Sequence, residues 1–410
     1  MLKKKGKNIV IIGGGAAGFF AAAASAEKNP GNNVMILEKG NTVLSKVKIS
    51  GGGRCNVTNS CLEPGELIKY YPRGGKELLS PFHKFNTKDT VEWFEKRGVK
   101  LKTEPDGKIF PISDDSQTIV DCLFDSVQRK GITVLLQTGV TNIQKSPQHG
   151  NWTITSPGKE FAADAVIICS GSSYSIWKTI ELLGHTIELP VPSLFTFNIK
   201  DKRIDGLPGV SVNDAVINIE GTKLKSNGPL LITHWGMSGP AILKLSAWGA
   251  REIHKKDYKF NLVINWLPGL NQESAKEMLS QVKNNNLTRS IYSFSPFGLP
   301  IRLWERLLEY SGIGRDLKWN NLSGTFMNRL AVQLTQSNFS VSGKSPFKEE
   351  FITCGGVSRR EIDFRTMQSK FHKGLFFTGE VIDIDAVTGG FNFQAAWTTG
   401  WIAGISASSI

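Results

Sequence analysis

The sequence predicts an α/β protein in which an inserted β-rich domain divides a parallel-sheet domain into two segments. Three observations support this fold class. A β-branched strand, a glycine turn and an alanine-rich helix follow one another within the first 30 residues. Short alternating strands and one helical stretch occupy the middle of the chain. The last part returns to small residues, a buried strand and an apolar helix.

The composition is that of a folded, multidomain chain. Its 410 residues allow two or three domains of ordinary size, and a 40% hydrophobic content argues against disorder. Five cysteines, an odd number, do not suggest a secreted disulfide framework, so a reducing, cytoplasmic setting fits better. The basic and then apolar start looks like a signal peptide, but glycines interrupt the apolar run. We therefore expect no membrane segment.

The charge admits two interpretations. A net charge of +13, from 49 basic and 36 acidic residues, could indicate a polyanionic partner such as RNA. Outside Lys3 to Lys7, however, basic residues alternate with acidic ones, and the sequence shows no helix-length basic stripe. We therefore expect a small-molecule substrate rather than a nucleic acid, and the oligomeric state stays open.

The first motif is G-x-G-x-x-G. It lies between the predicted strand Ile9 to Ile12 and a helix from about Ala16. In such a motif the first glycine permits a tight turn, the second lets a pyrophosphate approach the backbone, and the third lets the helix pack on the strand. The helix start then holds phosphate through its free amides. The residues expected at the phosphates are Gly13, Gly15, Ala16, Ala17 and Gly18.

A carboxylate follows at the expected distance. The apolar strand "VMILEK" ends in Glu38, 20 residues after Gly18. There it can accept hydrogen bonds from the ribose hydroxyls of an adenosine, and it would repel a 2′-phosphate. The motif therefore predicts FAD or NAD rather than NADP.

Two later strands end in small residues. The strand Ala165 to Cys169 ends in Ser170 and Gly171, where backbone can face a cofactor. The strand Leu375 to Thr378 ends in Gly379 and Glu380, and a Gly389-Gly390 turn then opens an apolar helix. The carboxylate can bind a polyhydroxylated chain, and the helix amides can face a carbonyl that gains negative charge. A flavin has both groups, so FAD is favoured over NAD.

Prolines near residue 190 mark the start of the inserted domain. We predict this substrate domain over residues 191–345, with a helical cap at about 271–320. The two segments of the cofactor-binding domain are then residues 1–190 and 346–410.

Several blocks together resemble one family, the BaiN-like (YhiN-type) FAD-binding oxidoreductases, which include enzymes described as aminoacetone oxidases and bile-acid-type enone reductases. The blocks "SGGGRCN" and "THWGMSGPA" are specific to this family, and "IIGGGAAG" and "GLFFTGEVIDIDAVTGGFNFQAAWTTG" also match it. The resemblance implies a split FAD Rossmann domain of the two-dinucleotide-binding type. It also implies an inserted β-rich domain with a helical subdomain.

The resemblance also implies roles for individual residues. Glu38 would bind the adenosine ribose and Lys39 would flank the adenine. A loop would wrap the isoalloxazine and phosphates, and it comprises Lys46, Ser50, Gly51, Gly52, Gly53, Arg54, Cys55 and Asn56. Gly379 and Glu380 would lie on the ribityl chain, with Gly389, Gly390, Phe391 and Asn392 at the pyrimidine edge. At Ser170 and Gly171 this chain departs from the family's usual Ala-Thr-Gly-Gly run.

Candidate catalytic groups are few, because a flavin performs the redox chemistry itself. His234, beside Trp235, could orient or protonate a substrate, or it could be a buried histidine bound to backbone. Lys48 could stabilise the reduced flavin anion or simply face solvent. Arg54 could hold an anionic substrate group or a flavin phosphate, with a salt bridge as the alternative.

Other chemistries find less support. Histidines and cysteines lack metal-ligand spacing, so we expect no metal. Cys55 and Cys61 have five residues between them, where FAD-dependent disulfide oxidoreductases have four, and a second dinucleotide motif is missing. An NAD(P)H donor, if used, would therefore bind transiently.

The leading hypothesis is an FAD-dependent oxidoreductase acting on a small organic substrate. It would reduce a conjugated C=C bond with NAD(P)H or oxidise an amine with O2. A tRNA-modifying flavoprotein and a non-catalytic flavin-binding protein are the alternatives.

Overall fold

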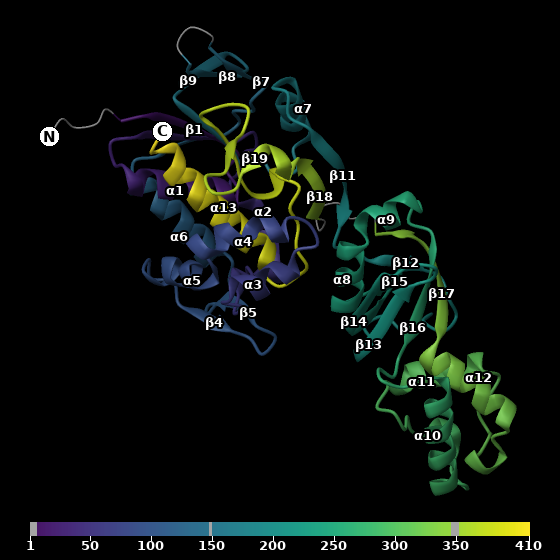
Figure 1. The fold of residues 1–410 in the computed structure, drawn as a ribbon. Coiled ribbons are helices and arrows are strands. Elements are labelled where there is room, and N and C mark those ends of the chain that lie inside the picture. The colour runs from purple at the N-terminus through teal and green to yellow at the C-terminus, as the bar shows by residue number, and fades with distance from the viewer. Residues whose placement is uncertain (1–5, 147–149, 346–351) are drawn as a thin grey trace. The chain divides into compact units, whose positions relative to one another are not determined.

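A computed structural model describes residues 6–146, 150–345 and 352–410 of the chain. It divides into two compact units (Figure 1). Residues 1–190 and 353–410 form the first, which we call the sheet unit, and residues 191–352 form the second, the barrel unit. The predicted return of the chain at residue 346 lies outside the described residues.

A seven-stranded sheet forms the centre of the sheet unit. Its strand order is β19-β20-β21-β10-β1-β2-β6, and the four pairs from β21 to β6 are parallel. The strands are β1 (Asn8–Ile12), β2 (Asn33–Leu37), β6 (Thr133–Leu135), β10 (Ala165–Ile168), β19 (Ile362–Asp363), β20 (Gln368–Ser369) and β21 (Leu375–Phe377). The middle strands are apolar and buried, as parallel strands covered by helices must be. The predicted α/β Rossmann fold is confirmed.

Two long helices, α1 (Ala16–Lys28) and α13 (Phe391–Ala407), pack through their backbones. A Cβ added at Gly400 would lie 2.5 Å from the Ala17 carbonyl oxygen, and one at Gly404 only 2.3 Å from that of Ala21. Because the contacts advance together along both helices, the helices run parallel. From these contacts, α13 starts about eight residues, or roughly 12 Å, before α1 does along the shared direction.

The rest of the sheet unit surrounds this pair. Its helices are α2 (Ser45–Gly53), α3 (Pro64–Leu67), α4 (Gly75–Lys84), α5 (Thr87–Glu95), α6 (Gln117–Gln128) and α7 (Tyr174–Leu182). Its small antiparallel sheets comprise β3 (Thr58–Asn59), β4 (Leu101–Thr103) and β5 (Lys108–Pro111), and β7 (Asn142–Lys145), β8 (Trp152–Ser156) and β9 (Lys159–Ala163). The paired strands β11 (Ile187–Ser193) and β18 (Ile352–Val357) carry the chain out of the sheet unit and back.

The barrel unit contains a closed barrel in the order β12-β15-β14-β13-β16-β17. The strands are β12 (Phe197–Ile199), β13 (Ser211–Ile219), β14 (Lys225–Thr233), β15 (Gly236–Ser238), β16 (Phe260–Asn265) and β17 (Ser337–Lys344). Helices α8 (Pro240–Trp248) and α9 (Ala250–Lys255) follow β15, and α10 (Gln272–Asn285), α11 (Ile301–Tyr310) and α12 (Gly324–Thr335) come between β16 and β17. The core holds large side chains such as Trp266, Trp304 and Phe339.

Candidate functional site

The glycine turn after β1 leaves open space in front of a helix start. Gly18 packs so closely that an added Cβ would lie 2.1 Å from the Gly13 carbonyl oxygen. Gly15 is the N-cap of α1 and has no side-chain cap, and an added Cβ there would meet nothing within 4 Å. The first amides of a helix have no partner inside the helix, so this space suits an anion.

A small cavity of about 90 Å³ adjoins the turn. Glu38 is held there by two backbone amides, with Gly14 N 2.8 Å from Oε2 and Gly40 N 2.7 Å from Oε1. The hydroxyl of Ser170 is buried and has no hydrogen-bond partner within the described residues. The lining residues are Ile12, Gly13, Leu37, Glu38, Lys39, Thr138, Gly139, Val140, Ser170, Ser173, Ser175 and Ile176. An open phosphate position, a ribose-type carboxylate and an unpaired hydroxyl fit the adenosine half of a dinucleotide.

Sequence reasoning missed the contribution of Thr138, Gly139 and Val140. These residues follow β6, whose parallel pairing with β2 places their segment beside Glu38. The only signal in the sequence was that the strand at Thr133–Leu135 ends there, at the carboxyl edge of a parallel sheet.

The segment predicted as a loop begins as a helix. α2 starts at Ser45 and breaks at Ser50, where ψ is 153°. Gly51 and Gly52 then have φ of 58° and 69°, in the left-handed region that side chains disfavour. An added Cβ at Gly52 or Gly53 would meet open space, so a flat ligand can approach this backbone.

The end of this segment is tied to the start of α13. In the amide orientation that satisfies its hydrogen bonds, Asn56 accepts from Gly390 N at 2.9 Å. Asn59 Nδ2 donates to the Gly389 carbonyl at 3.1 Å, and a Thr58–Gln394 side-chain hydrogen bond spans 2.5 Å. Residues 330 or more positions apart therefore form one structure around the α13 N-terminus.

The predicted pyrimidine-edge residues belong to the same structure. Gly390 caps α13 with φ of 87° and no side-chain cap, so the helix amides are available to a ligand. The Asn392 side chain is already engaged, because its Oδ1 accepts from Ala386 N at 2.9 Å and its Nδ2 donates to Ala386 O at 3.1 Å. Phe391 stacks on Tyr70 with 4.2 Å between ring centroids. The Asn392 side chain thus fixes the backbone at Ala386, in the segment that leads into α13.

Cys55 is a packed thiol. It is fully buried, and burial raises its pKa to about 12. Cys61 is also a free cysteine, and burial raises its pKa too. A thiolate nucleophile needs a lowered pKa, so neither residue has the environment of a reactive dithiol.

Glu380 and Lys46 form an ion pair. Lys46 Nζ lies 2.5 Å from Glu380 Oε2, and Thr353 N donates to Oε1 at 3.0 Å. Gly379 precedes Glu380 with φ of 67°, and a Cβ on Gly171 would lie 3.6 Å from the same carboxylate. Residues from three predicted segments therefore meet at one carboxylate.

Arg54 and Lys48 were the two other basic candidates of this segment. Arg54 Nη1 is 2.7 Å from Glu104 and 3.6 Å from Asp114, and its guanidinium stacks 4.0 Å over Phe110. The hydrogen bond to Glu104 raises the pKa of Arg54. These contacts correspond to the salt bridge that was the alternative for Arg54. Lys48 is exposed, which agrees with the alternative that it faces solvent.

His234 is not a buried histidine. It lies in the turn between β14 and β15 of the barrel unit, and both His234 and Trp235 are exposed. Its interpretation as a buried histidine bound to backbone is therefore wrong, and a role toward substrate stays a prediction.

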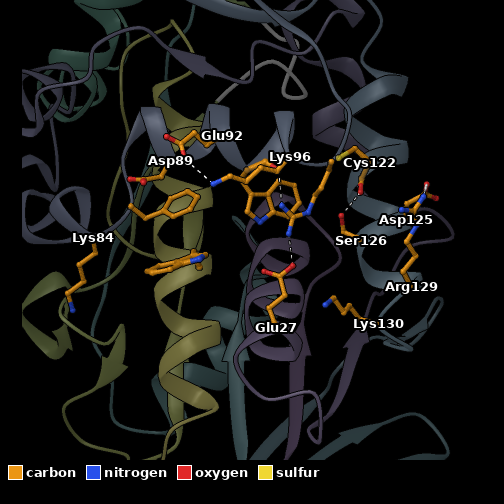
Figure 2. Close-up of a pocket in the computed structure, with 14 residues that line it drawn as sticks. Glu27, Lys84, Asp89, Glu92, Lys96, Cys122, Asp125, Ser126, Arg129 and Lys130 are labelled. Carbon is orange, nitrogen blue, oxygen red and sulfur yellow. Dashed lines mark hydrogen bonds and ion pairs between the residues drawn. The ribbon is translucent and has the colours of Figure 1, made fainter.

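A second cavity, of about 640 Å³, lies among α1, α5, α6 and α13 (Figure 2). Several of its charges are paired with one another. Arg97 lies 2.5 Å from Glu27 and stacks 3.6 Å over Trp93, and Lys96 lies 3.0 Å from Glu92. We assign this cavity no ligand.

The described ranges contain no group of three His, Cys, Asp or Glu side chains arranged to hold a metal ion. Within those same ranges, no helix has the length and apolar character needed to cross a bilayer.

Comparison with known proteins extends over nearly the whole chain. The family model described as "HI0933-like protein Rossmann domain" matches residues 7–406. The chain is 30% identical over 383 residues to the ribosomal RNA dihydrouridine synthase of Escherichia coli, covering 90% of this chain and 91% of that protein. It is 27% identical to the 3-dehydro-bile acid delta(4,6)-reductase of Clostridium scindens, covering 92% of each.

Solved structures agree on the fold. The 3-ketosteroid-delta4-(5alpha)-dehydrogenase of Rhodococcus jostii matches 99% of this chain and 97% of its own, with a TM-score of 0.52 and 13% identity. Together with the family match, the likeness places the chain in the fold predicted from its motifs. The chain therefore belongs to the HI0933-like (YhiN/BaiN) family and is an FAD-dependent oxidoreductase.

Proposed function

We propose that this protein reduces a carbon–carbon double bond conjugated to a carbonyl group, and that its substrate is a uridine of ribosomal RNA. The observation that carries the proposal is the 30% identity to a ribosomal RNA dihydrouridine synthase across nine tenths of both chains. Dihydrouridine is uridine whose C5=C6 bond, conjugated to the C4 carbonyl, has taken up two hydrogens. The bile-acid reductase named above likewise saturates double bonds beside a ketone, so one reaction type covers both relatives.

The cofactor would be held at the N-termini of two helices, α1 and α13. We place its pyrophosphate at the turn of Gly13, Gly15 and Gly18 and its adenosine ribose at Glu38. Glu380 would bind the ribityl chain, and the amides at the start of α13 would face the pyrimidine ring. The roughly 12 Å stagger between the two helix starts supports this, because one bound molecule must reach both ends.

FAD, when bound and reduced, would supply a hydride. The uracil ring would accept a hydride on one carbon of the double bond and a proton on the other, so that the bond is saturated without loss of atoms. A reduced nicotinamide nucleotide would supply the two electrons in each cycle and leave oxidised. His234 is our candidate for orienting or protonating the substrate, because its imidazole is exposed in the turn between β14 and β15.

The distribution of charge supports an RNA substrate over a small molecule. Residues 191–345 contain 19 Lys and Arg against 11 Asp and Glu, a net charge of +8. The other 255 residues contain 30 against 25, or +5. The excess is thus concentrated on the inserted segment, where the sequence showed only interleaved charges. A polyanion would be attracted there.

A steroid-type enone is the second candidate, favoured by the 27% identity to the bile-acid reductase. Neither named relative is an amine oxidase, so amine oxidation with O2 finds no support from them.

The test begins with the flavin-loaded protein, reduced anaerobically with NADH or NADPH. Ribosomal RNA transcribed without modifications is added, and reoxidation of the flavin is followed by absorbance. Digestion and mass spectrometry should show uridine that has gained two hydrogens. The proposal fails if the RNA leaves the flavin reduced, and reoxidation by a 3-oxo-4,6-diene steroid alone would establish the second candidate.

A further inference from the structure

Helices α8 and α9 form one exposed basic face on the barrel unit. The two helices are joined at Gly249, whose amide donates to Leu245 O at 2.9 Å and whose carbonyl accepts from Ile253 N at 2.8 Å. Helical hydrogen bonding therefore runs through the junction. Lys244, Trp248 and Lys255 lie at spacings of i, i+4 and i+11, which place them on one side of the helix.

The opposite side of the same helix is part of the barrel core. Ile242, Leu245 and Ile253 are fully buried there. Trp248, by contrast, is 45% exposed, and Lys244 and Lys255 are exposed. The orientation of the face toward solvent is thus fixed by the core.

The lysines of this face have no acid partner. Within the described ranges, Lys244, Lys255 and Lys256 have no carboxylate oxygen within 4.0 Å. Lys223 and Lys225 are also exposed, and no carboxylate oxygen of the described residues lies within 4.0 Å of them. They flank Leu224, whose side chain would lie 2.8 Å from a Cβ added at Gly249.

Acidic residues nearby are few. Asp257, which follows α9, is paired with Lys259 at 2.9 Å, and Glu252 is the acid of α9. Glu220, in the turn before Lys223, accepts a hydrogen bond from Asn261 at 2.9 Å. The face therefore keeps a positive excess, with one exposed indole among its lysines.

We propose that this face, defined by Lys223, Lys225, Lys244, Trp248, Lys255 and Lys256, binds a single-stranded segment of the RNA substrate. Unpaired lysines bind phosphates, and an exposed indole offers a surface on which a base can stack. The proposal rests on the function proposed above.

An anionic membrane is the competing partner for lysines and tryptophan. A helix that binds a bilayer surface needs a free apolar face beside its basic one. The apolar side of α8 and α9 is already used in the barrel core, which leaves Trp248 as the one large apolar side chain of the defined face. RNA is therefore the better fit.

The experiment uses the full-length, flavin-loaded protein and a fluorescein-labelled single-stranded oligouridylate. Binding is measured by anisotropy over a range of salt concentrations for K244Q/K255Q, W248A and two controls. K130Q/K318Q removes two exposed lysines outside the face, and Y174A removes an exposed aromatic ring from the sheet unit. Flavin absorbance and thermal unfolding check that each variant is folded.

We expect K244Q/K255Q to lower the slope of log K against log salt by about 1.4, or about 0.7 for each phosphate contact. W248A should weaken binding about tenfold. The controls should match the parent protein. A slope for K244Q/K255Q equal to that of K130Q/K318Q would overturn the proposal.

Vesicles of phosphatidylserine and phosphatidylcholine are tested in parallel. Binding to vesicles that is lost in K244Q/K255Q, without binding to the oligouridylate, would replace RNA by a membrane and overturn the proposal. Dihydrouridine formation is scored separately. RNA binding through this face without dihydrouridine formation would support the face and refute the proposed function. Dihydrouridine formation together with unchanged RNA binding by K244Q/K255Q would support the proposed function and refute the face.

Discussion

The sheet unit and the barrel unit are packed in different ways. In the sheet unit α1 and α13 touch through backbone, with Gly400 and Gly404 against the carbonyl oxygens of Ala17 and Ala21. In the barrel unit the core is filled by large side chains, including Trp266, Trp304 and Trp319. Close backbone contact fixes the positions of two helix N-termini relative to a ligand. A core of side chains, by contrast, supports a surface whose residues can be replaced. The proposed cofactor site therefore depends on glycines, and we expect substrate preference to depend on the barrel unit.

The largest expected effect is a loss of stability confined to the barrel unit. Trp304 is fully buried and donates to Ile291 O at 3.1 Å, so W304A leaves a large cavity and should cost about 3–5 kcal/mol. Calorimetry should show that this unit unfolds at a lower temperature than in the parent protein, while flavin absorbance persists. W248A is the matched control, because the same truncation at an exposed site leaves no cavity. Simultaneous loss of flavin and of the barrel unit would show that the units unfold together.

The next effect breaks the backbone contact. G404A adds a methyl group 2.3 Å from the Ala21 carbonyl oxygen, which must displace α13 from α1 at a cost of about 1–3 kcal/mol. We expect a lower midpoint of urea unfolding together with weaker FAD binding. Gly314 has open space at its Cβ position, so G314A should change neither. A stable G404A variant with normal FAD affinity would contradict the close packing.

A third substitution separates the site from the fold. G15V fills the open space in front of α1 without meeting a protein atom at its Cβ position, so the apoprotein should lose at most about 1 kcal/mol through the weaker N-cap. FAD affinity, measured by fluorescence quenching, should fall at least tenfold, or about 1.4 kcal/mol. G314V is the control, and unchanged affinity of G15V would place the pyrophosphate elsewhere.

A pH effect should belong to the sheet unit. His185 is buried against Glu361 at 3.0 Å and Ser369 at 2.9 Å, with the His372 ring nearby, and burial lowers the pKa of His185. The unfolded histidine, with a pKa of about 6.5, then takes up a proton before the folded one does. Stability is therefore retained above about pH 6.5 and falls as the pH drops below it. Urea unfolding should show that H185Q loses less free energy of unfolding on acidification than the parent does. An equal loss would exclude His185 as the cause.

The smallest effect on function concerns Cys55. Because its thiol is buried with a pKa of about 12, C55S should leave turnover of the flavin-loaded protein largely intact, with a stability loss of about 1–2 kcal/mol from the buried hydroxyl. Complete loss of turnover with FAD still bound would assign Cys55 a chemical role.

Much of the sheet unit follows from local patterns. The strand before Gly13 and the helix after Gly15 occur where the motif predicts them, because a turn of this kind depends on neighbouring residues only. Sequence could not show that Arg54 pairs with Glu104 and Asp114, since these acids lie on another part of the chain. Nor could it show that His234 is exposed, because exposure depends on what packs around a turn.

The sequence by itself predicted a flavin cofactor and an inserted β-rich domain, because glycine spacing, a carboxylate at the end of a strand and a change of strand pattern are local features. Only the tertiary structure decided which distant residues meet. It joined Asn56 to Gly390 and Lys46 to Glu380. Such contacts depend on helix and sheet packing between segments hundreds of residues apart, which no local pattern encodes.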